Sequence, residues 1–101
     1  MNAKLTRETK AIVIHAMRHA EINGNLFTSV KVFLYEGYGK ERRFTIRYHY
    51  CYGSQHVTDV AVALGLAHED ELRNFCATHD IALHTILEYA SKQEAEEWGH
   101  D

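Results

Sequence analysis

Apolar residues in the first quarter of the chain recur at helical spacing. The positions concerned are Val13, Ala16, Met17 and Ala20, and spacings of three and four residues place side chains on one face of an α-helix. Thr6 is suited to the N-cap position, and Asn23-Gly24-Asn25 is a typical C-terminal stop. The pattern predicts a helix from residue 7 to about residue 22.

The period changes to two between residues 27 and 52. Val30, Val32 and Leu34 alternate with Lys31, Phe33 and Tyr35. Beyond the turn at 37–40, one parity carries Phe44, Ile46, Tyr48, Tyr50 and Tyr52, and the other carries Arg43, Thr45, Arg47, His49 and Cys51. β-branched and aromatic residues on both sides of a glycine-bearing turn predict an antiparallel β-hairpin.

Helical spacing returns after Gly53. One segment starts at Ser54 or Thr58 and ends at Gly65, and a second runs from His68 to about His79. Asp80 is suited to cap a last helix from Ile81 to about Ala90, beyond which residues 93–101 are expected to fray as an acidic end. The predicted fold is therefore a single small α+β domain over residues 1–101. It has an N-terminal helix, a two-stranded antiparallel β-hairpin and three helices (α-β-β-α-α-α), with the hairpin packed on helices as a single layer.

Strand parity selects a candidate interaction site. Successive strand residues point to opposite faces, so we expect the tyrosines of the second strand to face the helices. The other face would then carry Lys31, Phe33, Tyr35, Arg43, Arg47 and His49. Cations interleaved with aromatic rings suit an acidic protein surface or single-stranded nucleic acid. An acidic helix of the same chain lying across this face is the alternative.

Charge is divided unevenly between the two halves of the chain. Residues 1–50 carry nine Lys and Arg against four Glu, whereas residues 51–101 carry two against ten Asp and Glu, within a net charge of −3. Such asymmetry sets the field that a partner meets. The acidic half supplies a second candidate surface: Glu69, Asp70, Glu71, Glu94 and Glu97.

Motifs for chemistry are absent from the sequence. His15 and His19 would share a face of the predicted helix, but no third ligand accompanies them. Cys51 and Cys76 belong to no C-x-x-C pair, and neither a phosphate-binding glycine loop nor a G-x-S-x-G motif occurs. We therefore predict no catalytic residues, no metal, no cofactor and no enzymatic activity.

One segment resembles a DNA-binding motif. Val60-Ala61, Leu64-Gly65-Leu66, Leu72 and Phe75 are similar to the helix-turn-helix pattern of small repressors and of the arabinose-type regulator family, although Leu72 stands one residue late. The resemblance implies a recognition helix, but that helix would begin with Glu69, Asp70 and Glu71, which phosphates repel. We interpret the segment as two packed helices without DNA-reading function.

These observations favour a non-enzymatic regulator or inhibitor that docks on a larger protein, with a nucleic-acid-handling protein among the candidates, as in small accessory proteins of phages and mobile elements. A nucleic-acid-binding module using the basic hairpin face is the alternative, and a homodimer formed through the hairpin edge or Phe33 and Tyr35 is a further option. No apolar run reaches membrane-spanning length. Two cysteines and a polar N-terminus lacking a signal sequence favour the cytoplasm.

Overall fold

The computed structural model describes residues 5, 8–22, 24–50 and 53–99, except for the side chains of Tyr38, Arg47, Tyr48 and Tyr50. These residues form a four-stranded mixed sheet with three α-helices. The inward orientation predicted for Tyr48, Tyr50 and Tyr52 lies outside what is described, as does Cys51.

The sheet has the strand order β3-β2-β1-β4. Its strands are β1 (Thr9–Ala20), β2 (Leu26–Glu36), β3 (Glu41–Tyr50) and β4 (Ala82–Tyr89). The turn between β2 and β3 contains a short 3₁₀ helix, η1 (Gly37–Gly39). The first three strands are antiparallel neighbours, and β4 runs parallel to β1. The strand β1 is therefore central, and β3 and β4 are the two edges of the sheet.

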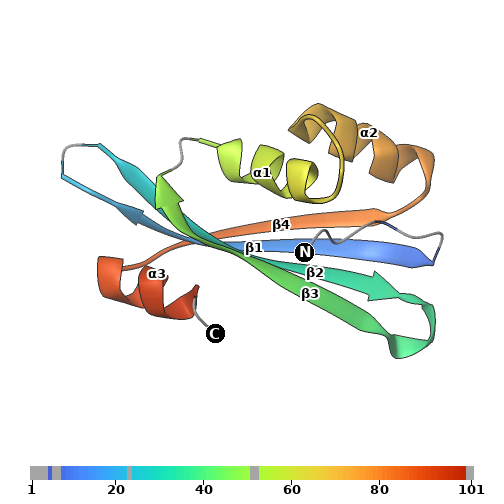
Figure 1. Ribbon diagram of the computed structural model, residues 1–101, viewed down its shortest axis with the longest axis horizontal. Helices are drawn as coiled ribbons and strands as arrows, with labels where there is room; N and C mark the ends of the chain where they lie inside the picture. The colour runs from blue at the N-terminus through green and yellow to red at the C-terminus, as the bar shows by residue number, and fades with distance from the viewer. Residues whose placement is uncertain (1–4, 6–7, 23, 51–52, 100–101) are drawn as a thin grey trace.

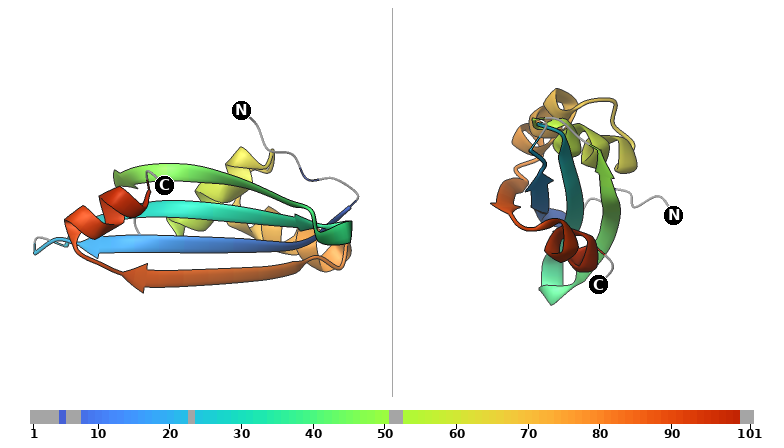
Figure 2. Two further views of the ribbon diagram at one scale, coloured as in Figure 1. Left: turned by 90° about the horizontal axis from the view of Figure 1, so that it is seen from below. Right: turned by 90° about the vertical axis from the view of Figure 1, so that its left-hand side faces the viewer.

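Helices cover both faces of this sheet. Helices α1 (Gln55–Ala63) and α2 (Glu69–Thr78) pack on one side, and α3 (Lys92–Trp98) crosses the other (Figures 1 and 2). We call the side of α1 and α2 the inner face and the side of α3 the outer face. The main core lies on the inner face, where buried side chains of the strands meet buried side chains of the two helices. The strands contribute Ile12, Ile14, Ala16, Val30, Val32 and Leu34, and the helices contribute Val57, Val60, Ala61 and Leu72.

The predicted N-terminal helix is wrong, because Thr9–Ala20 is strand β1. Ile12, Ile14 and Ala16 are buried at a period of two, and the intervening side chains are half-buried on the outer face. A central strand covered on both faces needs apolar residues at both parities. That need creates accidental helical spacing, and the β-branched run Ile12-Val13-Ile14 decides in favour of a strand.

The predicted last helix is also wrong, because Ala82–Tyr89 is strand β4. Asp80 does not cap a new helix. It has a φ of 55° and lies in the left-handed region, which short polar side chains tolerate. The Ile81 N–H donates back to the Cys76 carbonyl at 2.8 Å, a bond that ends α2. The hairpin predicted from the sequence, β2 and β3, is therefore only half of the sheet. Strand β1 pairs with β2, and β4 pairs with the other side of β1 as an edge strand.

Other predicted elements match the structure. β2 and β3 form the antiparallel hairpin, and α1 and α2 follow the two predicted helical segments. Gly65 has a φ of 89° between them, and the Leu66 N–H donates to the Ala61 carbonyl, which closes α1. In the described part of the chain no helix combines the length and the apolar character needed to cross a membrane.

Residues 92–99 pack against the sheet, whereas the sequence predicts a frayed acidic end over 93–101, of which residues 100 and 101 lie outside the described residues. Ala95 in α3 is fully buried, and the Ser29 hydroxyl on β2 donates to its carbonyl at 2.8 Å. Gly99 lies so close to β2 that a Cβ there would stand 2.5 Å from the Ser29 Oγ. The small residues Ala95 and Gly99 thus allow α3 to approach the outer face.

Candidate interaction site

The outer face is divided between a covered end and an open end. Helix α3 lies across the strands at one end, and the end near η1 carries no helix (Figure 2, left, with α3 in red). Side chains at odd positions of β2 point to this face, because Ser29 bonds to α3 and strand residues alternate. Phe33 and Tyr35 therefore lie on the outer face beyond α3.

The open end forms a shallow hollow with aromatic and basic walls. A cavity of about 420 Å³ is lined by Lys31, Phe33, Arg43, Phe44 and Thr45. Tyr35, one position further toward η1 on the same face, is 38% exposed. Phe33 is half-buried, and its register partner Arg43 is exposed. We call Lys31, Phe33, Tyr35, Arg43 and Thr45 the aromatic-basic patch.

Trp98 of α3 borders the patch on its covered side. The Lys31 ammonium lies 4.4 Å from the centroid of the Trp98 ring, a geometry in which the ring face attracts the cation. The His15 ring meets the same Trp98 ring edge-on at 5.0 Å, and its Nε2 lies 3.5 Å from a Glu88 carboxylate oxygen. Lys31 is thus half-buried beneath α3, and the open surface consists mainly of Phe33, Tyr35 and Arg43.

His49 does not belong to this patch, although sequence parity placed it there. The register of β2 and β3 shifts between Thr28 and Val30, so His49 pairs with Thr28. Its Nε2 lies 2.9 Å from Asp59 Oδ2 on α1, which places the ring on the inner face. A bulge reverses the alternation of a strand, and the sequence carries no clear signal for it. The side chain of Arg47 lies outside the described residues.

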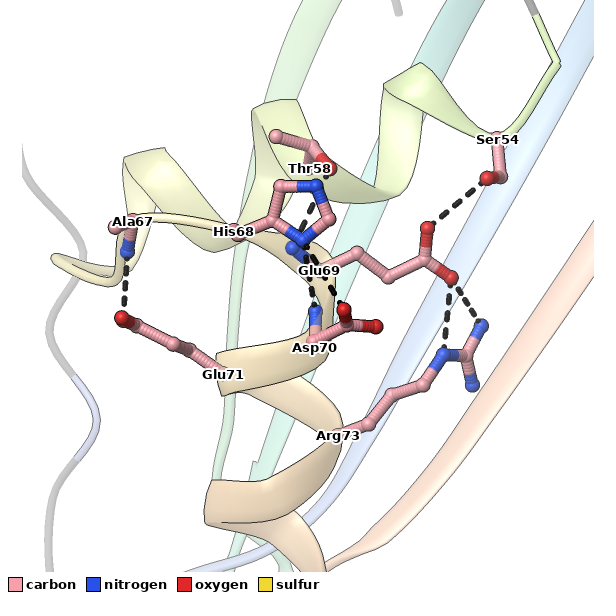
Figure 3. Close-up of polar contacts among 8 residues, drawn as sticks. All are labelled: Ser54, Thr58, Ala67, His68, Glu69, Asp70, Glu71 and Arg73. Atoms are coloured by element: carbon pink, nitrogen blue, oxygen red, sulfur yellow. Dashed lines mark hydrogen bonds and ion pairs between the residues drawn. The ribbon is translucent and has the colours of Figure 1, made fainter.

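The acidic start of α2 is occupied by local contacts (Figure 3). Glu69 accepts hydrogen bonds from Arg73 at 2.8 and 2.9 Å and from the Ser54 hydroxyl at 2.9 Å. The bonds from Arg73 are the main reason why the pKa of Glu69 is lowered. Glu71 accepts from the Ala67 N–H at 2.9 Å, and Asp70 is exposed. The positive end of the dipole of α2 also stabilises these carboxylates.

Glu94 and Glu97 lie elsewhere, on α3. Both are exposed, and they accept hydrogen bonds from Ser91 and Gln93 respectively. Since α2 covers the inner face and α3 the outer face (Figure 1), the five acidic residues predicted as one secondary surface form two separate groups. The α3 group lies on the helix whose Trp98 contacts Lys31 of the aromatic-basic patch.

A polar cluster on the inner face, centred on Arg18, has no counterpart among the sites predicted from the sequence. This arginine is 2% exposed, and it contacts Thr28 Oγ1 at 3.0 Å, the Gly53 carbonyl at 2.7 Å and His56 Nδ1 at 3.2 Å. A hollow of about 360 Å³ adjoins it, lined by Arg18, Gly53, Ser54, His56, Val57, Arg73, Thr85 and Leu87. The sequence contains one indication that Arg18 is buried: it continues the period of two that Ile12, Ile14 and Ala16 follow in the central strand.

The environment of His56 lowers its pKa. Burial of the ring is the largest cause, and the charge of Arg18 is the second. Because arginine only donates, Nδ1 of His56 accepts from it, so the neutral ring carries its proton on Nε2.

We expect the free energy of unfolding to decrease as the pH falls below about 6.5, the ordinary pKa of histidine. In that range the unfolded chain binds a proton that folded His56 resists. His56→Gln keeps an acceptor for Arg18 and should flatten this part of the curve. Urea unfolding of both proteins between pH 5 and 8 measures the difference, and two parallel curves would contradict the expectation.

The histidines of the N-terminal segment do not share one face of a helix. His15 and His19 lie on a strand, where four residues span about 13 Å, too far for both rings to bind one ion. Among the described residues, no group of three or more His, Cys, Asp or Glu side chains is arranged to hold a metal. Cys76 is a buried free thiol whose pKa is raised by burial, so it is a poor nucleophile.

Comparisons of the chain with models of protein families, with curated proteins and with solved structures find no match.

Proposed function

We propose that this chain is a non-enzymatic binding protein, a small regulator or inhibitor that docks on a larger protein through the aromatic-basic patch. The observation that carries the proposal is the half-buried Phe33 ring lying beside the exposed Tyr35 and Arg43 on an open sheet face. Exposed aromatic and arginine side chains are enriched where protein interfaces concentrate their binding energy.

The charge around the patch supports a protein partner over nucleic acid. Lys31 and Arg43 are the cations among the described patch residues, and the exposed Glu94 and Glu97 belong to α3, the helix that covers the other end of the outer face (Figure 2). A nucleic-acid strand following this face would pass those carboxylates, which repel phosphates. A protein segment with an apolar side chain for the hollow and a carboxylate for Arg43 meets no such repulsion.

The proposal also includes a reducing cytoplasmic location. The thiol of Cys76 is buried and unpaired, a state that a reducing compartment maintains.

Affinity capture from a host lysate with two matched variants tests the proposal. The patch variant Tyr35→Ala/Arg43→Glu removes a ring and reverses a charge within the patch. The control Val62→Ala/Lys92→Glu makes similar changes at exposed positions of α1 and α3. We expect a partner retained by the wild type and the control, and bound at least about tenfold more weakly by the patch variant. Equal capture by all three proteins would contradict the proposal.

A titration with labelled single- and double-stranded oligonucleotides tests the alternative. Fluorescence anisotropy at about 50 mM and about 200 mM salt is sufficient, because phosphate contacts weaken steeply over that range. If the partner is a protein, we expect no oligonucleotide binding that depends on the aromatic-basic patch. Salt-sensitive binding that Arg43→Glu abolishes would instead establish a nucleic-acid-binding module.

A further inference from the structure

The strand β4 is an edge strand with apolar side chains on both faces. It pairs with β1 on one side, and along the other side no element of the described chain lies beyond it (Figure 2, left). Ile86 points to the outer face and is 42% exposed, and Leu87 and Tyr89 point to the inner face and are 40% and 66% exposed. An edge of this kind is a template for pairing with another strand.

The opposite edge of the sheet, strand β3, is protected against pairing with another chain, whereas β4 is not. Strand β3 carries four charged residues and borders a register shift: Glu41, Arg42, Arg43 and Arg47. Charges and bulges are the usual devices that prevent edge pairing. In contrast, β4 carries a single carboxylate, contains no lysine, arginine or proline, and pairs with β1 without interruption.

The backbone of β4 has its free hydrogen-bonding groups at alternate positions. The Ala90 N–H donates to the Arg18 carbonyl on β1. In a regular parallel ladder, residues two apart point the same way, so His84, Ile86 and Glu88 also direct their amides toward β1. Leu83, Thr85, Leu87 and Tyr89 direct theirs away from the sheet.

We propose that two copies of this chain pair through their β4 edges, antiparallel and centred on Ile86, to form one continuous eight-stranded sheet. This dimer goes beyond the proposed docking function, because β4 and the aromatic-basic patch are separate surfaces. It also uses a different edge from the hairpin edge that the sequence offered as a further option.

Symmetry and charge select the register. A two-fold axis perpendicular to the sheet must lie midway between a residue and its own copy, because a register that pairs even with odd positions would turn one inner face outward. Centres at Thr85 and Ile86 pair equal lengths of β4. The Ile86 centre places His84 opposite Glu88 of the second copy and Leu83 opposite its Tyr89, whereas the Thr85 centre leaves Tyr89 unpaired. A carboxylate facing an imidazole N–H, and apolar pairs across strands, stabilise a sheet.

Sedimentation equilibrium over a concentration series tests the dimer. We expect the apparent mass of the wild type to rise toward twice the monomer mass. Ile86→Lys places two ammonium groups at the axis and should raise the dimer dissociation constant at least about tenfold. Thr85→Pro removes an outward N–H without affecting the ladder to β1, and should act in the same direction. Val62→Lys on α1 is the matched control and should change nothing.

A charge exchange tests the register. In a dimer of His84→Glu, each introduced carboxylate faces Glu88 of the other copy. In a dimer of Glu88→Lys, each introduced ammonium faces His84 of the other copy and the carboxylate is lost. Both variants should therefore associate more weakly than the wild type. Mixed together, they place the introduced carboxylate opposite the introduced ammonium and restore one pair of His84 with Glu88, so they should form a heterodimer. A wild type that stays monomeric at all concentrations, a dimer insensitive to Ile86→Lys and Thr85→Pro, or a mixture without recovery would overturn the proposal.

Discussion

Arg18→Met is expected to lower the free energy of unfolding by about 3 kcal/mol. Methionine fills a similar apolar volume on the inner face but donates no hydrogen bond. The buried Thr28 hydroxyl, the Gly53 carbonyl and His56 Nδ1 each lose the donor they have in the native protein. Each buried polar group left unsatisfied costs about 1–3 kcal/mol. Urea unfolding followed by the fluorescence of Trp98, the single tryptophan of the chain, measures the loss.

The same substitution has a second readout that a simple packing defect would not produce. The charge of Arg18 contributes to the lowered pKa of His56. In Arg18→Met that pKa should rise but stay below its ordinary value, because burial, the larger cause, remains. An NMR titration of the His56 ring measures it. Arg18→Lys is the matched control, since it keeps the charge and loses the forked geometry. It should destabilise the protein while leaving the pKa lowered.

Ile14→Ala is expected to lower the free energy of unfolding by about 3–4 kcal/mol. Ile14 is fully buried in the central strand, between Val32 of β2 and Thr85 of β4. Its removal leaves a cavity where the sheet meets α1 and α2, and alanine is also a poorer strand residue. Chemical denaturation measures the change.

Val13→Ala is the matched control for this prediction. Val13 is half-buried on the outer face, so its truncation should cost roughly 1 kcal/mol or less. If the N-terminal segment were a helix, Val13→Ala would cost more stability than Ile14→Ala, because Val13 belongs to the apolar stripe of that helix and Ile14 does not. A larger loss for Val13→Ala than for Ile14→Ala would therefore contradict the strand.

Local sequence determined the elements whose signals act over a few residues. The hairpin of β2 and β3 follows from alternation around a glycine-bearing turn, and α1 and α2 follow from apolar periodicity closed by Gly65. The outer-face positions of Phe33 and Tyr35 also follow from alternation in β2, because the register shift near Thr28 lies beyond them.

Tertiary structure decided the elements that are covered on both faces or lie at the edge. In β1, the inner face packs on α1 and α2 and the outer face meets α3, so both parities are apolar and the period of two is hidden. In β4, an edge strand with little burial, the periodicity that marks a buried face is weak. Its parallel pairing with β1 joins residues about seventy positions apart, which no local pattern encodes.

The same division applies to the candidate sites. Composition determined that the first half of the chain is basic and the second acidic. The fold decided that His49 turns to Asp59, that Lys31 lies under Trp98 and that the acidic residues separate onto two faces. The physical reason is that a side chain's face depends on pairing register, and its exposure depends on which distant helix covers that face.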